Sequence, residues 1–166
     1  GLDSKQMSLD YNYRLPKAIA KVAQQIIGGG VDLMSNNQKD GGNSDYPNYP
    51  KPIITQYANP EKELEGILTR IQMEDLDDVA ILVPSDKEVM MVNDYLANHG
   101  IKTQVMYRTG NTVPFRTVNT LDFSNNDLPC ILTYYAAKGS EFDNVFVPFA
   151  NTSNDCSRNS FYVACT

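Results

Sequence analysis

The chain has 166 residues, of which 42% are hydrophobic and 20% are charged, a composition typical of a single globular domain. Its apolar runs fall far short of the roughly 20 residues that a membrane-spanning helix needs, and the first ten residues lack the apolar core of a signal peptide. The formal net charge is −6, which excludes nucleic-acid binding through a uniformly basic surface and requires a local groove for any such binding.

The cysteines give an expectation about the compartment. Cys130, Cys156 and Cys165 are odd in number and widely spaced, which argues against a disulfide framework and favours a reducing cytoplasm. With a single histidine in the chain, they also offer no zinc-ligand spacing.

The first third of the chain predicts a helix, a loop and a strand. Residues 15–30 carry apolar residues at helical spacing, with a proline at the start and three glycines at the end. Residues 35–50 are polar and rich in glycine and proline, which predicts a flexible surface loop. Residues 52–57, "PIITQY", predict a buried strand.

Two helices and two strands are predicted next. Residues 59–71 predict an amphipathic helix capped by Asn59. The apolar run that follows Asp78 predicts a buried strand, and Ser85 with Glu88 has the spacing of a capping box for a helix that Gly100 ends. Residues 102–107 predict another strand.

The last third predicts strands at 117–123, 130–134 and 144–149, and the start of a final helix at 157–166. Strands that are apolar throughout and alternate with amphipathic helices indicate a mostly parallel sheet covered on both faces. We therefore expect a three-layer α/β fold.

One segment stands out within this pattern. In "TYYAAKGSEFDNVF", residues 133–146, Lys138, Gly139 and Glu141 follow directly after an apolar strand. Parallel α/β sheets bind ligands at the carboxyl ends of their strands, so these residues are placed where a ligand is expected. The alternative interpretation is a glycine turn followed by a solvated acid.

Three segments resemble motifs of the UvrD/Rep-like superfamily 1 helicases. "LTYYAAKGSEFDNVFVPF" resembles motif V, "LDYNYRLPKAIAKVA" resembles motif IV, and "NSFYVACT" resembles the start of motif VI. They occur in the family's order and span nearly the whole chain. The resemblance implies a RecA-like fold over residues 1–166, as the second motor domain of an ATP-driven helicase, with roles in DNA repair or recombination.

The resemblance also implies an ATP site shared with a preceding RecA-like domain, which would hold Mg²⁺. Tyr13 would stack on the adenine and Arg14 would reach the γ-phosphate, where a permanently charged guanidinium suits the transferred phosphoryl group. Glu141, with Gly139 beside it, would accept hydrogen bonds from the ribose hydroxyls. Thr133 and Tyr135 would face single-stranded or partly duplex DNA.

The sequence departs from the family pattern in its phosphate loop, in motif V and in the length of one insertion. No phosphate-binding G-x-x-x-x-G-K-[ST] loop occurs in the sequence, so we expect the chain to be an inactive part of a longer enzyme. Motif V has Tyr135 in place of the usual histidine and Ser140 in place of the usual leucine, and a tyrosine keeps a ring for base stacking. Only about thirty residues replace the accessory domain that larger relatives insert, which indicates a compact member.

Other interpretations stay open. The domain could be a binding or regulatory module that keeps the RecA-like fold without turnover. It could also be an unrelated nucleotide-binding α/β domain, although a glycine-rich phosphate loop would then be expected. His99 is most simply a solvated residue at a helix C-terminus.

Overall fold

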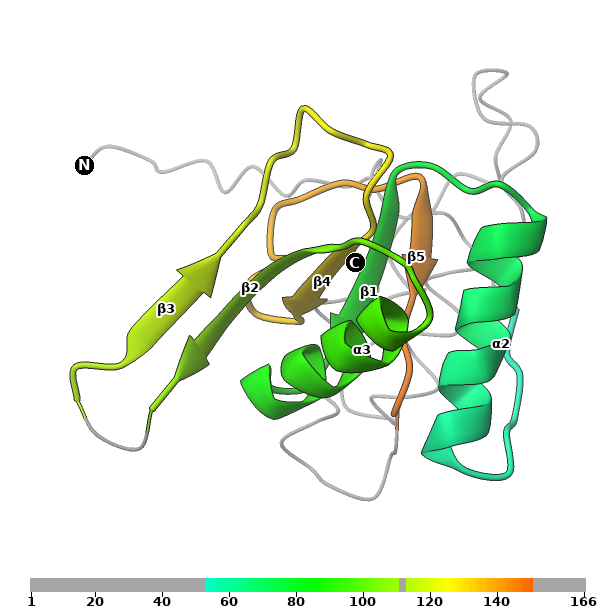
Figure 1. Ribbon diagram of the computed structural model, residues 1–166, viewed down its shortest axis with the longest axis horizontal. Helices are drawn as coiled ribbons and strands as arrows, with labels where there is room; N and C mark the ends of the chain where they lie inside the picture. Colours follow the sequence, from blue (N-terminus) through cyan, green and yellow to red (C-terminus); the bar gives the residue numbers. More distant parts are fainter. Residues whose placement is uncertain (1–52, 111–112, 151–166) are drawn as a thin grey trace, which may run out of the picture. The chain divides into compact units, whose positions relative to one another are not determined.

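The computed structural model describes residues 53–110 and 113–150 (Figure 1). The chain divides into two compact units, and every described helix and strand belongs to the unit Thr55–Ala164. The predicted helix at 15–30, the loop at 35–50 and the final helix from 157 lie outside the described residues. Whether residues 1–166 form one domain stays a prediction.

Helix α2, Pro60–Met73, is confirmed by the structure. The Asn59 side chain accepts a hydrogen bond from the backbone N–H of Lys62 at 2.9 Å, and Pro60 occupies the first helical position, where a missing N–H costs nothing. The buried residues recur at helical spacing: Leu64, Ile67, Leu68 and Ile71. This apolar stripe fixes which side of the helix meets the sheet.

Strand β1, Val79–Val83, leads into helix α3, Asp86–Asn98. Every residue of β1 is buried, as its continuous apolar sequence predicts. Ser85 occupies the N-cap position, but its hydroxyl donates to the Glu88 carboxylate and makes no bond to a backbone N–H. The predicted N-cap position of Ser85 is therefore confirmed, whereas the side-chain-to-backbone hydrogen bonds that a capping box requires are not formed. Gly100 ends the helix with a φ of +80°, a conformation that glycine adopts without strain.

Four further strands complete a five-stranded sheet: β2, Gln104–Thr109; β3, Arg116–Asn119; β4, Cys130–Thr133; and β5, Asn144–Phe146. Their order is β3-β2-β4-β1-β5. All pairs are parallel except β2 with β3, which form an antiparallel hairpin. The predicted strands at 102–107, 117–123, 130–134 and 144–149 are thus confirmed, with shifted bounds. The fold is α/β with a mostly parallel sheet, as expected.

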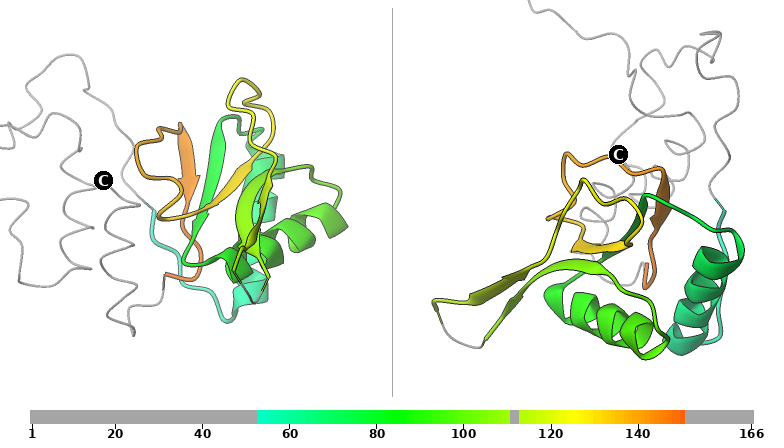
Figure 2. Two further views of the ribbon diagram at one scale, coloured as in Figure 1. Left: turned by 90° about the vertical axis from the view of Figure 1, so that its left-hand side faces the viewer. Right: turned by 45° about the horizontal axis from the view of Figure 1, so that its top comes forward.

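The two faces of this sheet are covered differently. Both described helices pack on one face, with Val79, Ile81 and Val83 of β1 at its centre (Figures 1 and 2). The opposite face presents Ala80 and Leu82, together with β4 residues. Within the described residues it is covered by the segment between β4 and β5 and by Leu121 of the loop before β4, so the expected second helical layer stays a prediction.

The strand predicted at 52–57 is wrong. The described residues 53–57 pair with no strand, and the side chains of Ile53 and Ile54 are 72% and 76% exposed. Both positions beside β1 are taken by β4 and β5, which come much later in the sequence. An apolar run alone cannot reveal that both positions beside β1 are occupied by other strands.

Among the described helices, none is long and apolar enough to cross a membrane.

Candidate functional site

The segment 134–143 connects opposite ends of the sheet; we call it the return loop. It leaves the carboxyl end of β4, yet β5 pairs in parallel with β1 from Val79 opposite Asn144. The chain must therefore travel back to the amino end of the sheet before β5 can begin (Figure 1). Two turns start this path, with the N–H of Ala137 donating to the Thr133 carbonyl at 3.0 Å and that of Ser140 donating to the Ala137 carbonyl at 2.9 Å.

Thr133 and Tyr135 lie together at the carboxyl end of β4. Thr133 is in register with Val83, the last residue of β1, and its hydroxyl accepts a hydrogen bond from the N–H of Ala136 at 3.1 Å. Tyr134 is buried at 2% exposure, whereas Tyr135 is 81% exposed. The ring of Tyr134 thus packs in the core, whereas the ring of Tyr135 lies in solvent, where a tyrosine can stack on a planar ligand.

Gly139 lies in the middle of the return loop with a φ of +84°. A Cβ added at Gly139 would meet no atom of the described residues within 4 Å, so within this part of the chain the glycine is explained by its left-handed backbone conformation. Lys138 beside it is exposed. The alternative interpretation of a glycine turn therefore accounts for the local conformation of Gly139.

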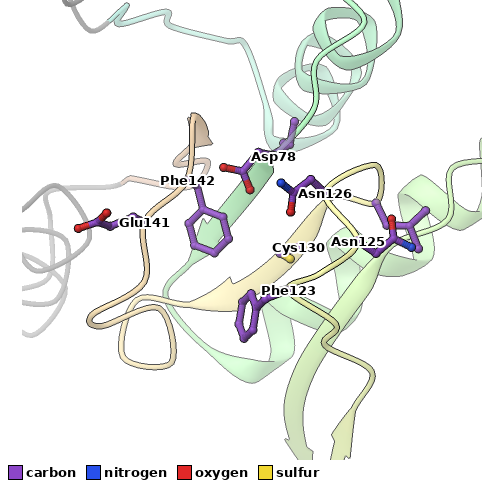
Figure 3. Close-up of a pocket in the computed structure, with 9 residues that line it drawn as sticks. Asp78, Phe123, Asn125, Asn126, Cys130, Glu141 and Phe142 are labelled. Carbon is purple, nitrogen blue, oxygen red and sulfur yellow. The ribbon is translucent and has the colours of Figure 1, made fainter.

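Glu141 lies at the other end of the sheet. It lines a hollow of about 250 Å³ next to Asp78, which precedes β1, Val79, which begins β1, and Cys130, which begins β4 (Figure 3). The expectation that Lys138, Gly139 and Glu141 share the carboxyl edge is thus corrected for Glu141. The physical reason is the parallel pairing of β5, which forces the loop back along the sheet.

The hollow has an aromatic wall and a hydrogen-bonded rim. The rings of Phe123 and Phe142 are 6.4 Å apart between centroids and tilted by 45°. Asp78 joins the rim to both flanking segments, because its Oδ2 accepts from the N–H of Asp143 at 2.9 Å and its own N–H donates to the Asn126 carbonyl at 2.9 Å. Figure 3 shows the Glu141 carboxylate pointing away from both rings.

Cys130 lines this hollow, and the residue is only 5% exposed. Burial raises its pKa, and the nearby Asp78 carboxylate raises it further. A thiol held neutral in this way is a poor nucleophile. Among the described residues, no group of three histidine, cysteine or acidic side chains is arranged to hold a metal ion.

Tyr13 and Arg14 lie outside the described residues, so their expected convergence with Glu141 stays a prediction. Sequence reasoning missed Asp78, Phe123 and Phe142 as lining residues. The available signal for Asp78 was its position directly before a buried strand. Phe123 and Phe142 are far apart in sequence and meet only because both loops pass the amino end of the sheet.

Comparison with known family models found no match, and comparison with curated proteins found none either. Among solved structures, the chain is similar to the C-terminal domain of a possible DNA helicase from Lactobacillus plantarum WCFS1, at 22% sequence identity and a TM-score of 0.46. The match covers 63% of this chain and 60% of the other. The chain thus spans less than two thirds of this distant neighbour.

Proposed function

We propose that the chain is the second RecA-like motor domain of an ATP-dependent DNA helicase or translocase, within a longer protein. One observation carries the proposal: the segment that resembles motif V forms an interior parallel strand, a turn with the exposed Tyr135, and a return to a second parallel strand. The motifs resembling IV and VI, in the family's order on either side, support it from the sequence.

In this proposal, Thr133 and Tyr135 contact the single strand of DNA. The exposed ring of Tyr135 stacks on a base, an interaction worth about 1–3 kcal/mol that tolerates any sequence. Thr133 keeps Tyr135 in place, because its hydroxyl accepts from the N–H of Ala136 in the turn. Sequence-independent stacking is what a protein that moves along DNA requires.

The proposed ATP contacts come from other parts of the chain. Arg14 stabilises charge on the γ-phosphate, Tyr13 stacks on the adenine, and Glu141 with Gly139 binds the ribose. The preceding domain supplies the phosphate loop and Mg²⁺. The return loop joins Tyr135 at one end of the sheet to Glu141 at the other, so one ten-residue segment would connect the DNA and nucleotide contacts.

DNA-stimulated ATP hydrolysis by the longer protein tests the proposal. Arg14→Ala should lower the stimulated rate by about a thousandfold, the lower end of the effect of an arginine finger. Tyr135→Ala should raise the DNA concentration needed for half-maximal stimulation about tenfold, the equivalent of about 1.4 kcal/mol of lost stacking. Met73→Ala is the control for Tyr135→Ala, because Met73 is equally exposed at 81% and lies on α2. Equal rates in wild type and Arg14→Ala would remove Arg14 from the site.

A binding module without turnover is the second candidate. The observation that favours it is the sequence itself, which lacks a phosphate loop and has Tyr135 where the family has histidine. The two candidates differ in one measurement on the longer protein: a module binds DNA but hydrolyses no ATP, with or without DNA.

A further inference from the structure

The β2–β3 hairpin is an acid-free region on an acidic protein. The sequence has 20 acidic and 14 basic residues, yet residues 95–121 contain no aspartate or glutamate. Arg108 on β2 and Arg116 on β3 are both exposed. Neither has an ion-pair partner among the residues that the structure describes. Positive charge that the described residues leave uncompensated is available to an anionic partner.

The hairpin extends past the carboxyl end of the neighbouring strand. β2 pairs with β4 with Gln104 opposite Cys130 and Val105 opposite Ile131, and continuing that register puts Tyr107 level with Thr133. β2 then runs on to Thr109, and each strand residue adds about 3.3 Å. By this count the end of the hairpin projects about 7 Å beyond Thr133 before its turn begins. In Figure 1 the shared end of β2 and β3 extends past the end of β4.

The register also determines the faces on which the two arginines lie. Arg108 shares a face with Met106, because strand residues alternate, and Met106 packs in the cluster that contains Tyr134. Arg116 is paired with Thr109 and so belongs to the other face. The projecting end thus carries one guanidinium on each face, with Arg108 on the side where the return loop leaves β4.

Exposed apolar side chains lie next to these charges. Val113 is 81% exposed and Phe115 is 48% exposed, directly before Arg116. An exposed ring next to an arginine matches the combination that binds single strands, in which bases stack on aromatic rings and phosphates meet cations. The exposed ring of Tyr135 lies at the end of the adjacent strand β4.

We propose that the β2–β3 hairpin is a second single-strand nucleic-acid contact, which extends the surface at Tyr135 sideways across β4 and β2. Arg108 and Arg116 meet phosphates, and Phe115 stacks on a base. The class of partner rests on the proposed function, whereas the site itself is separate from the residues that resemble motif V.

The test is a titration of the isotope-labelled 166-residue chain with oligothymidylate at low salt, followed by amide chemical shifts. We expect saturable shifts at Arg108, Thr109, Arg116 and Thr117 as well as at Tyr135. Arg108→Gln with Arg116→Gln should weaken binding and reduce the slope of log K against log salt by about 1.4, because each single-strand phosphate contact contributes about 0.7. Phe115→Ala should weaken binding without changing that slope.

Lys102→Gln is the matched control, because Lys102 is an exposed cation just before β2 begins, at the far end from the hairpin turn. Weakening by Tyr135→Ala with unchanged binding in the arginine variants would overturn the hairpin site and leave the proposed function standing. An equal effect of Lys102→Gln, or no binding by the wild-type chain, would also overturn it. Identical hairpin shifts with polyglutamate, and none at Phe115, would assign the surface to acidic proteins instead.

Discussion

Gln104 is the one buried polar side chain among the described residues, with 2% exposure. It stands at the start of β2 and fixes the loop that leads to β4. Its Nε2 donates to the carbonyls of Asn125 and Leu128 at 2.6 and 3.3 Å, and its Oε1 accepts from the N–H of Asp122 at 2.6 Å. One amide thus satisfies three backbone groups in a loop with no strand or helix of its own.

Replacing this amide should be costly. Gln104→Leu keeps the volume but leaves those three part-buried backbone groups without their partner, so we expect the free energy of unfolding to fall by about 3 kcal/mol, at about 1 kcal/mol for each group left unsatisfied. Urea denaturation measures the change. Gln72→Leu, on the exposed side of α2, should change it by less than about 0.5 kcal/mol. A similar small change for Gln104→Leu would show that water replaces the amide.

Cys130 gives a prediction with a pH dependence. Burial and Asp78 raise the pKa of its thiol, so the unfolded chain ionises first as pH rises past the ordinary thiol pKa, and stability is lost in that range. With the other two cysteines replaced by serine, Asp78→Asn should speed alkylation of Cys130 at pH 8, because removing the carboxylate lowers the thiol pKa and raises the thiolate fraction. Asp94→Asn, on α3, should leave the rate unchanged. No acceleration by Asp78→Asn would remove this carboxylate as a cause.

At the scale of elements, α2 carries a glycine where an alanine would make a better helix. A Cβ at Gly66 would lie 2.3 Å from the Tyr57 hydroxyl oxygen, so the glycine leaves room for the ring of the segment before α2. That segment is the incorrectly predicted strand. Its apolar residues have no place in the sheet, and Tyr57 instead lies against the helix.

A double-mutant cycle tests this contact. Gly66→Ala alone should give little gain in stability, because the helical advantage of about 1 kcal/mol is offset by displacement of Tyr57. In a Tyr57→Ala background the same substitution should stabilise by about 1 kcal/mol. Thermal unfolding measures both. The same gain in the two backgrounds would mean that the ring moves aside without cost.

The helices and strands themselves were predictable where one local signal decides them. Asn59 and Pro60 gave the start of α2, and the continuous apolar sequence gave β1. The wrong strand at 52–57 and the misplaced Glu141 share one cause, which is the order of strands. Pairing between distant segments leaves no periodic signal, so the sequence could not show that β4 and β5 flank β1.

At the scale of the whole described unit, the same limit applies to the candidate site. Gly139 was singled out because it follows an apolar strand, whereas Thr133 and Tyr135 were named only through the resemblance to motif V. The structure brings Thr133 and Tyr135 together at a strand end. The hollow beside Glu141 and the projecting hairpin depend on register. Their residues come from several loops and two strands, which only the assembled sheet brings together.

The strand order also determines when the sheet can be completed as the chain is synthesised. β4 lies between β1 and β2, so a nascent chain that has been synthesised only as far as β2 holds two strands that are not neighbours in the finished sheet. The position between β1 and β2 is filled only when residues 130–133, which form β4, leave the ribosome. Until then the unfinished protein exposes unpaired strand edges, which are the kind of surface through which folding chains associate with one another.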